Sequence, residues 1–94
     1  TKVCWTELGY LTGEGISNPL PAGFTWAQNT TLANQATWLA RAATLSKQSG
    51  KVRMMIIWNI DQRSWDNDPQ AGFSIFRPDG TCPACTSLRQ AMGR

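Results

Sequence analysis

The chain has 94 residues, 41% of them hydrophobic and 16% charged, which is enough apolar material for one small domain and too much for a disordered chain. Nine Lys and Arg against six Asp and Glu give a net charge of +3. The basic residues are scattered and no apolar run reaches the ~18 residues of a membrane span, so we expect no nucleic-acid surface and no membrane segment. The absence of His excludes His-based metal sites and nucleophile–His pairs.

Residues 2–6 are β-branched or aromatic for the most part and contain neither Gly nor Pro, which predicts a short buried strand. Residues 9–30 follow as a long loop, because they contain several helix- and strand-breaking residues: Gly9, Gly13, Gly15, Pro19, Pro21 and Gly23. Loops of this length in compact domains are commonly functional.

The sequence predicts a helix over residues 30–49. Asn29 or Thr30 can cap its start, and Gly50 closes its C-terminus. Its apolar residues recur at helical spacing: Leu32, Ala36, Leu39 and Ala43. Its polar residues fall elsewhere around the helix: Gln35, Arg41 and Lys47.

Residues 52–60 are almost continuously apolar, which is typical of a strand covered on both faces in a parallel sheet. The remaining segments are a polar loop at 61–71, a short extended piece at 72–76, a turn at 77–80 and a helix from Pro83 to about Met92. The order is therefore strand, loop, helix, twice over. It predicts an α/β fold with parallel strands, in which the loops at the carboxyl ends of the strands carry the chemistry.

Glu7 is the first candidate for chemistry, since a carboxylate at the end of a buried strand is costly unless it is used or paired. The alternative is a structural ion pair with an Arg at the strand end. Trp58 and Asn59 end the second strand at the matching level, where an indole can stack on a sugar ring. The alternative for Trp58 is a core residue. Trp65 lies among hydrogen-bonding residues in the next loop, as in a carbohydrate site or an ordinary solvated loop.

The three cysteines are too few for a disulfide scaffold. Cys82 and Cys85 form a C-x-x-C motif at the start of the last helix, and a zinc site there would have only Cys4 and a carboxylate to complete it. Redox or metal chemistry, incidental thiols and a local disulfide are all compatible with this motif.

Four segments, taken in order, resemble the C-terminal quarter of clan A glycoside hydrolases of the cellulase-like and β-xylosidase-like kind. They are 6–9 (Thr-Glu-Leu-Gly), 35–39 (Gln-Ala-Thr-Trp-Leu), 52–59, which ends in Ile-Trp-Asn, and 72–80 (Gly-Phe-Ser-Ile-Phe-Arg-Pro-Asp-Gly). The resemblance implies that residues 1–94 are the last two β-loop-α units of a (β/α)8 TIM barrel with its helices outside. The chain begins without Met or a signal peptide, as expected for a piece of a longer protein.

The resemblance also implies a secreted, extracellular enzyme with a carbohydrate substrate and no cofactor or metal. Glu7 takes the place of the retaining nucleophile and Trp58 that of the floor of the cleavage subsite, while Asn59 and Trp65 remain substrate-binding candidates from their position alone. The family's acid/base Glu, which follows an Asn, has no counterpart here, and we interpret Glu14 as a solvated loop residue. Cys82 and Cys85 depart from the family pattern in the last helix.

Two functions follow. The first is the C-terminal part of a retaining glycosidase that cleaves O-glycosidic bonds in β-linked glycans and is inactive alone. It is expected to pair with the missing part of the barrel or with copies of itself through open sheet edges. The alternative is a small non-catalytic carbohydrate-binding or interaction module. Such a module would expose its Trp residues on strands, whereas Trp5 and Trp58 are expected in buried runs and Trp38 on the helix.

Overall fold

The computed structural model describes residues 1–16, 19–62 and 69–93. Its regular elements follow in chain order: β1 (Val3–Leu8), the short 3₁₀ helix η1 (Thr25–Ala27), α1 (Leu32–Ser49), β2 (Val52–Ile57), the 3₁₀ helix η2 (Gln70–Phe73) and α2 (Pro83–Ala91). The repeated order of strand, loop and helix predicted from the sequence is thus confirmed over the described parts of the chain.

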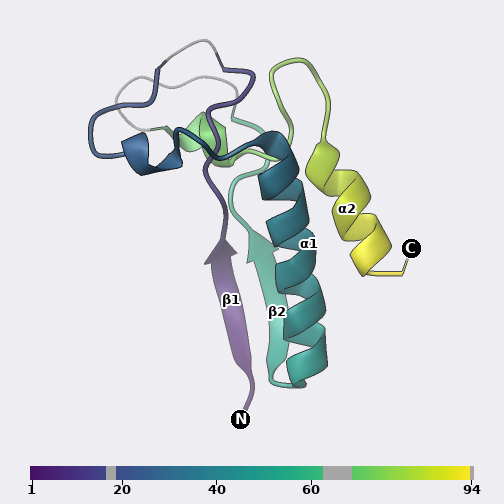
Figure 1. The fold of residues 1–94 in the computed structure, drawn as a ribbon. Helices are drawn as coiled ribbons and strands as arrows, with labels where there is room; N and C mark the ends of the chain where they lie inside the picture. Colours follow the sequence, from purple (N-terminus) through teal and green to yellow (C-terminus); the bar gives the residue numbers. More distant parts are fainter. Residues whose placement is uncertain (17–18, 63–68, 94) are drawn as a thin grey trace.

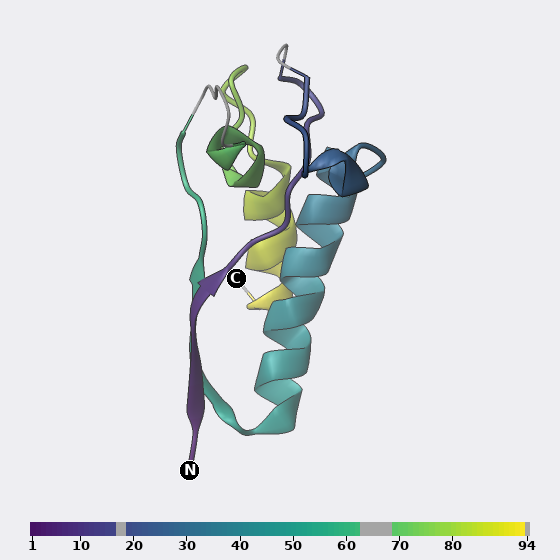
Figure 2. The same cartoon turned by 90° about the vertical axis from the view of Figure 1, so that its left-hand side faces the viewer.

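The two strands pair in parallel, and α1 connects them. Figure 2 shows that α1 lies on the side of the sheet that faces the viewer in Figure 1, where β2 lies to the right of β1 with both arrows pointing up. The crossover is therefore right-handed, as the chirality of β-α-β units requires. The predicted α/β class and parallel pairing are confirmed.

The first turn of α1 is capped one residue later than predicted. Thr31, rather than Asn29 or Thr30, accepts a hydrogen bond from the Asn34 amide at its side-chain oxygen (3.0 Å), and the Asn34 side chain accepts one from the Thr31 amide (2.9 Å). This reciprocal pair satisfies two amides that the helix itself leaves free. Gly50 ends the helix in the left-handed region (φ 66°), as predicted.

Both helices cover the same face of the sheet, and the opposite face is bare (Figure 2). On β2 the half-buried Met55 and Ile57 alternate with Met54 and Ile56, which are 46% and 45% exposed. The expectations of a buried first strand and of a second strand covered on both faces are therefore wrong for this chain. The physical reason is that α1 and α2 pack side by side on one face (Figure 1), so the described residues leave the other uncovered. The core combines residues from both helices and the last loop: Ala36, Leu39, Ile75 and Ala84, with Ile57 packed against them.

The second strand stops at Ile57 rather than Ile60 because the following residues pair with another segment. The Asn59 amide donates to the Phe73 carbonyl (3.2 Å), and the Ile75 amide donates back to the Asn59 carbonyl (3.0 Å). The piece predicted as extended over 72–76 is thus partly a 3₁₀ turn, since Gly72 and Phe73 belong to η2, and only its second half is extended enough to pair.

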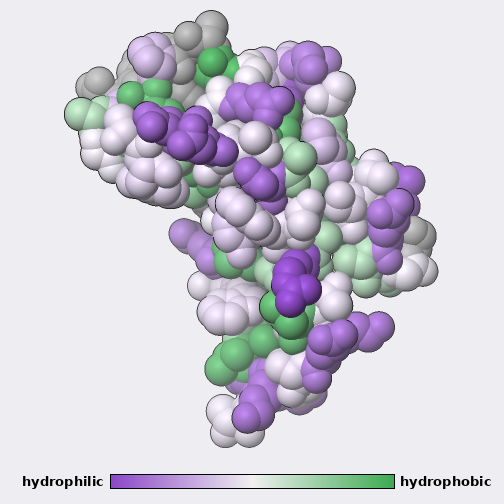
Figure 3. Space-filling view, in the orientation of Figure 1, coloured by the Kyte–Doolittle hydropathy of each residue, from purple (hydrophilic) through white to green (hydrophobic). Residues whose placement is uncertain are grey.

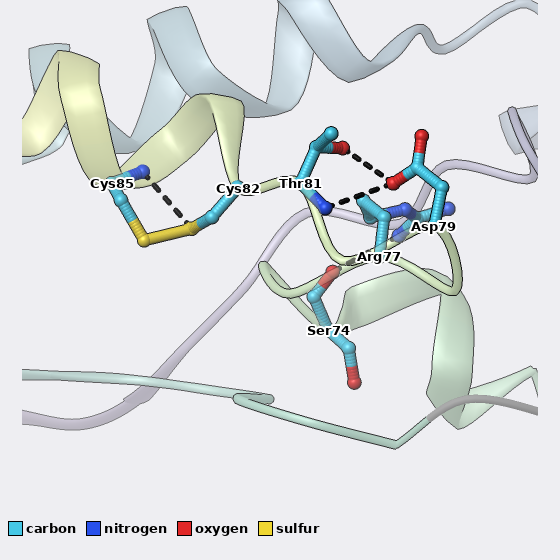
Figure 4. The surroundings of a disulfide bond; sticks show 6 residues. All are labelled: Ser74, Arg77, Asp79, Thr81, Cys82 and Cys85. Carbon is cyan, nitrogen blue, oxygen red and sulfur yellow. Dashed lines mark hydrogen bonds between the residues drawn. A yellow bond between two sulfur atoms is a disulfide. The ribbon is translucent and has the colours of Figure 1, made fainter.

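A disulfide joins Cys82 and Cys85 across the first turn of α2, which answers the question that the C-x-x-C motif left open (Figure 4). Cys4 is a free, exposed thiol. The bridge closes a ring of few residues, so it restricts the unfolded chain only slightly. In the parts of the chain that the structure covers, no group of three or more metal-ligating side chains comes together, and no helix is long and apolar enough to cross a membrane.

The capping pair at α1 gives a first test. We expect Thr31→Ala to lower the free energy of unfolding by about 0.5–2 kcal/mol, because the Asn34 amide loses its side-chain acceptor, while the bond from the backbone amide of residue 31 to Asn34 can remain. Urea denaturation measures this change. Thr37→Ala, at an exposed position within the same helix, is the matched control and should not be destabilising, since Ala is the better helix former. Equal stability of the Thr31→Ala chain and the unmodified chain would contradict the capping role.

Candidate functional site

Glu7 and Trp58 lie at the same end of the sheet. Glu7 is the second-to-last residue of β1, and Trp58 directly follows β2. The Trp58 amide donates to the Leu8 carbonyl (2.8 Å), so the two strands are still joined where they end. Parallel strands bring their carboxyl ends to one edge, and the pairing of Leu8 with Ile57 does so here.

Gly9 allows the two strand ends to approach this closely. A Cβ atom built on Gly9 would overlap the Trp58 carbonyl oxygen and would lie 3.2 Å from the Phe73 ring. Any side chain at this position must therefore push the Trp58 backbone away from β1. Glycine is thus required at position 9 by the close approach of another backbone segment, whatever its own backbone dihedral angles.

Trp58 presents a partly open indole whose orientation is fixed. It is 41% exposed, and its Nε1 donates to the Gln70 side-chain oxygen at 2.7 Å. The neighbouring Asn59 uses its own amide locally, since Nδ2 donates to Gln62 (3.3 Å) and Oδ1 accepts from the Ile60 amide (2.7 Å). An open aromatic face with amide groups around it suits stacking on a sugar ring. Trp65, the other aromatic candidate, lies outside the described residues.

The Glu7 carboxylate is exposed to solvent. Within the described residues no hydrogen bond or ion pair engages it, so the alternative of a structural pair with an Arg is not seen there. The site therefore combines a carboxylate that is unengaged among the described residues with a hydrogen-bonded, open indole just after the next strand.

Glu14 is an exposed loop residue, as the sequence indicated, but its carboxylate has a hydrogen-bond partner. Its Oε1 accepts a hydrogen bond from the Leu32 amide (2.9 Å), at the first residue of α1. A negative charge is favourable at a helix N-terminus, where unpaired amides concentrate positive potential. Glu14 therefore supports α1 and is not placed as a second carboxylate beside Glu7.

Two buried polar side chains, missed at the sequence level, tie the loops at this end of the sheet together. Arg77 is 1% exposed, and its guanidinium donates to five backbone carbonyls, those of Thr12, Glu14, Ala71, Gly72 and Ser74, at 2.7–3.4 Å. Gln35 is fully buried on α1, and its Nε2 donates to the carbonyls of Tyr10, Gly72 and Phe73 at 3.0–3.4 Å.

The expectation that Gln35 lies on the polar side of the helix is therefore wrong. Its position three residues after Leu32 and four before Leu39 places it on the apolar stripe, and that spacing was the available signal. Nothing local in the sequence distinguishes Arg77 from a surface arginine.

Burial lowers the pKa of Arg77, and the charges of Glu14 and Asp79 act in the opposite direction. Asp79 accepts from the hydroxyl (2.6 Å) and the amide (2.9 Å) of Thr81, which hold the pKa of its carboxyl below the usual value (Figure 4). These bonds, together with the bond from the Arg77 amide to the Thr81 carbonyl (2.9 Å), fix the turn from which the Arg77 side chain projects.

A second surface feature is an apolar groove of about 650 Å³ between β1 and α1. Figure 3 shows hydrophobic atoms gathered over this part of the molecule. Its main lining residues are Trp5, Leu8, Tyr10, Trp38, Ala42 and Leu45. The Trp5 indole donates to Ser46 (3.1 Å), yet Trp5 is 44% exposed and Trp38 39%. The expectation that Trp5 and Trp58 are buried is therefore wrong, because one face and both edges of the sheet are open.

In comparisons with known proteins, no family model, no curated protein and no solved structure matches this chain significantly.

The close approach at Gly9 can be tested. We expect Gly9→Ala to cost about 1–3 kcal/mol of unfolding free energy, because the added methyl group overlaps the Trp58 carbonyl. Gly15→Asn is a suitable control, since nothing lies within 4 Å of its Cβ position and Asn accepts the positive φ of 79°. Urea denaturation compares the two variants, and equal losses would contradict the proposed steric role.

Proposed function

We propose that this chain carries the nucleophile half of a retaining glycoside hydrolase site, with Glu7 as nucleophile and Trp58 as the sugar-stacking surface. The observation that carries this proposal is that the exposed Glu7 carboxylate, which has no partner among the described residues, and the open, hydrogen-bonded Trp58 indole lie at one edge of a parallel sheet. The resemblance of the Thr-Glu-Leu-Gly and Trp-Asn segments to clan A glycoside hydrolases supports the same assignment.

In this mechanism Glu7 attacks the anomeric carbon and the glycosidic oxygen leaves with a proton from a second carboxyl group. Water then hydrolyses the covalent glycosyl-enzyme. The second group must lie about 5–5.5 Å from Glu7 in a retaining enzyme. Glu14 is engaged at the start of α1, so we infer that the acid/base comes from outside this chain.

The one-sided sheet supports the finer hypothesis that β1–α1 and β2–α2 are the last two units of a (β/α)8 barrel. In such a barrel the helices pack outside, and the opposite face of the strands points inward. The exposed Met54 and Ile56 side chains would then fill the barrel interior. The bare face and free strand edges would be covered by further β-α units. As in such enzymes, the assembled protein would be secreted.

Replacing Glu7 tests the assignment. In the protein assembled with the remaining barrel units, we expect Glu7→Gln to abolish turnover of an aryl β-glycoside and to leave sugar binding largely intact, since the carboxylate acts in bond breaking. Glu14→Gln is the matched control and should retain turnover, because the amide oxygen can still accept from Leu32. A Glu7→Gln enzyme that keeps most of its kcat would refute the nucleophile assignment.

The isolated chain is expected to be inactive and to associate. Loss of general acid catalysis alone costs a factor of about 10²–10⁴, and open strand edges seek partners. Light scattering should give a mass above the 10.4 kDa of one chain. Leu45→Lys, in the apolar groove, should weaken this association, whereas Thr37→Lys, elsewhere on α1, should not. A monomer at all concentrations would contradict the expectation.

A non-catalytic carbohydrate-binding module is the second candidate. The partial exposure of Trp5, Trp38 and Trp58 favours it, since open indoles supply stacking surface. Sugar binding lost on Trp58→Ala, combined with an assembled protein that hydrolyses no glycoside, would support this function over the first.

A further inference from the structure

The two segments that carry the candidate site are joined by backbone hydrogen bonds, such as that from the Trp58 amide to the Leu8 carbonyl (2.8 Å), and by buried side chains from other parts of the chain. Glu7 belongs to β1, which continues into the loop that contains Thr12 and Glu14. Trp58 follows β2, and its indole is oriented by Gln70, the first residue of η2. Whatever fixes η2 against the loop after β1 therefore also fixes the indole relative to the carboxylate.

Arg77 makes that connection. One nitrogen, Nη2, donates to the carbonyls of Thr12 (3.2 Å) and Glu14 (2.7 Å) in the loop after β1. The other, Nη1, donates to the carbonyls of Ala71 (3.4 Å) and Gly72 (3.3 Å) within η2. The planar guanidinium thus spans both segments at once, which a single ammonium group cannot do.

We propose that Arg77 is a positioning residue that fixes the Trp58 indole relative to Glu7, acting through η2 and Gln70. The inference rests on the proposed function for the role of Glu7, but the orientation of Trp58 can be measured without any reaction. Arg77 touches neither residue and no substrate, so its effect is indirect. Its burial and its five carbonyl partners make it a rigid link rather than a surface charge.

The test follows the Trp58 indole proton by ¹H–¹⁵N spectroscopy, with the signal assigned through Trp58→Phe. In the Arg77→Lys chain we expect this signal to shift and its exchange with solvent to accelerate about tenfold, as for one lost hydrogen bond. Gln70→Leu should reproduce the effect, since it removes the acceptor and leaves the Arg77 bonds in place. Arg89→Lys, an exposed Arg→Lys change on α2, is the control and should leave the signal unchanged.

An Arg77→Lys chain that folds and retains the original Trp58 signal would overturn the proposal. If the Arg77→Lys chain does not fold, hydrogen exchange in the unmodified chain provides the test. The Trp58 indole proton and the Thr12 amide proton, which is bonded to the Gly72 carbonyl (3.0 Å), should then exchange with the same dependence on urea. Different dependences would show that η2 and the loop after β1 open separately, and would also overturn the proposal.

The experiments distinguish a failure of the proposed function from a failure of the positioning role of Arg77. If Glu7→Gln retains turnover while Arg77→Lys releases the Trp58 indole, the nucleophile assignment is wrong and the positioning role of Arg77 stands. If Glu7→Gln abolishes turnover while the Trp58 signal is unchanged in the Arg77→Lys chain, the nucleophile assignment stands and the positioning role of Arg77 is wrong.

Discussion

The Gly72 carbonyl oxygen accepts hydrogen bonds from three parts of the chain. They come from the Thr12 amide (3.0 Å), the Gln35 side chain on α1 (3.3 Å) and the Arg77 guanidinium (3.3 Å). Buried polar groups are costly unless they are paired, so these donors and acceptors hold one another in place. These hydrogen bonds hold the two loops at the carboxyl edge of the sheet together, beside the buried apolar residues of the same loops, such as Leu11 and Ala71.

Two kinds of interaction hold the fold: apolar packing, and hydrogen bonds to buried backbone carbonyls such as that of Gly72. Apolar packing of α1, α2 and β2 sets the outer layer of the fold. Polar bonds hold the loops that follow Glu7 and Trp58 at the carboxyl edge of the sheet. Such a division suits a binding or catalytic site, because a site needs exposed groups that are nevertheless held still. The remaining face of the sheet is apolar and open, which explains why the proposed function requires further β-α units.

The candidate site is chemically one-sided as well. Glu7 offers an exposed carboxylate with no partner in the described part of the chain, whereas the Glu14 carboxylate accepts a hydrogen bond from the first amide of α1. One carboxylate and one indole can bind and attack a sugar but cannot protonate the leaving group. In the proposed barrel, further β-α units would both cover the bare sheet face and supply the acid.

The sequence by itself determined the order of the elements, the end of α1 at Gly50, the start of α2 at Pro83 and the parallel pairing, because these follow from local propensity and from a strong rule of chirality. It also indicated that Glu7 and Trp58 would share one edge. Only the tertiary structure decided that Thr31 caps α1, that β2 stops at Ile57, that one sheet face is bare and that Gln35 and Arg77 are buried. These features depend on partners distant in the chain, such as the Phe73 carbonyl for Asn59 and the Thr12 carbonyl for Arg77, and no local pattern encodes which distant group will arrive.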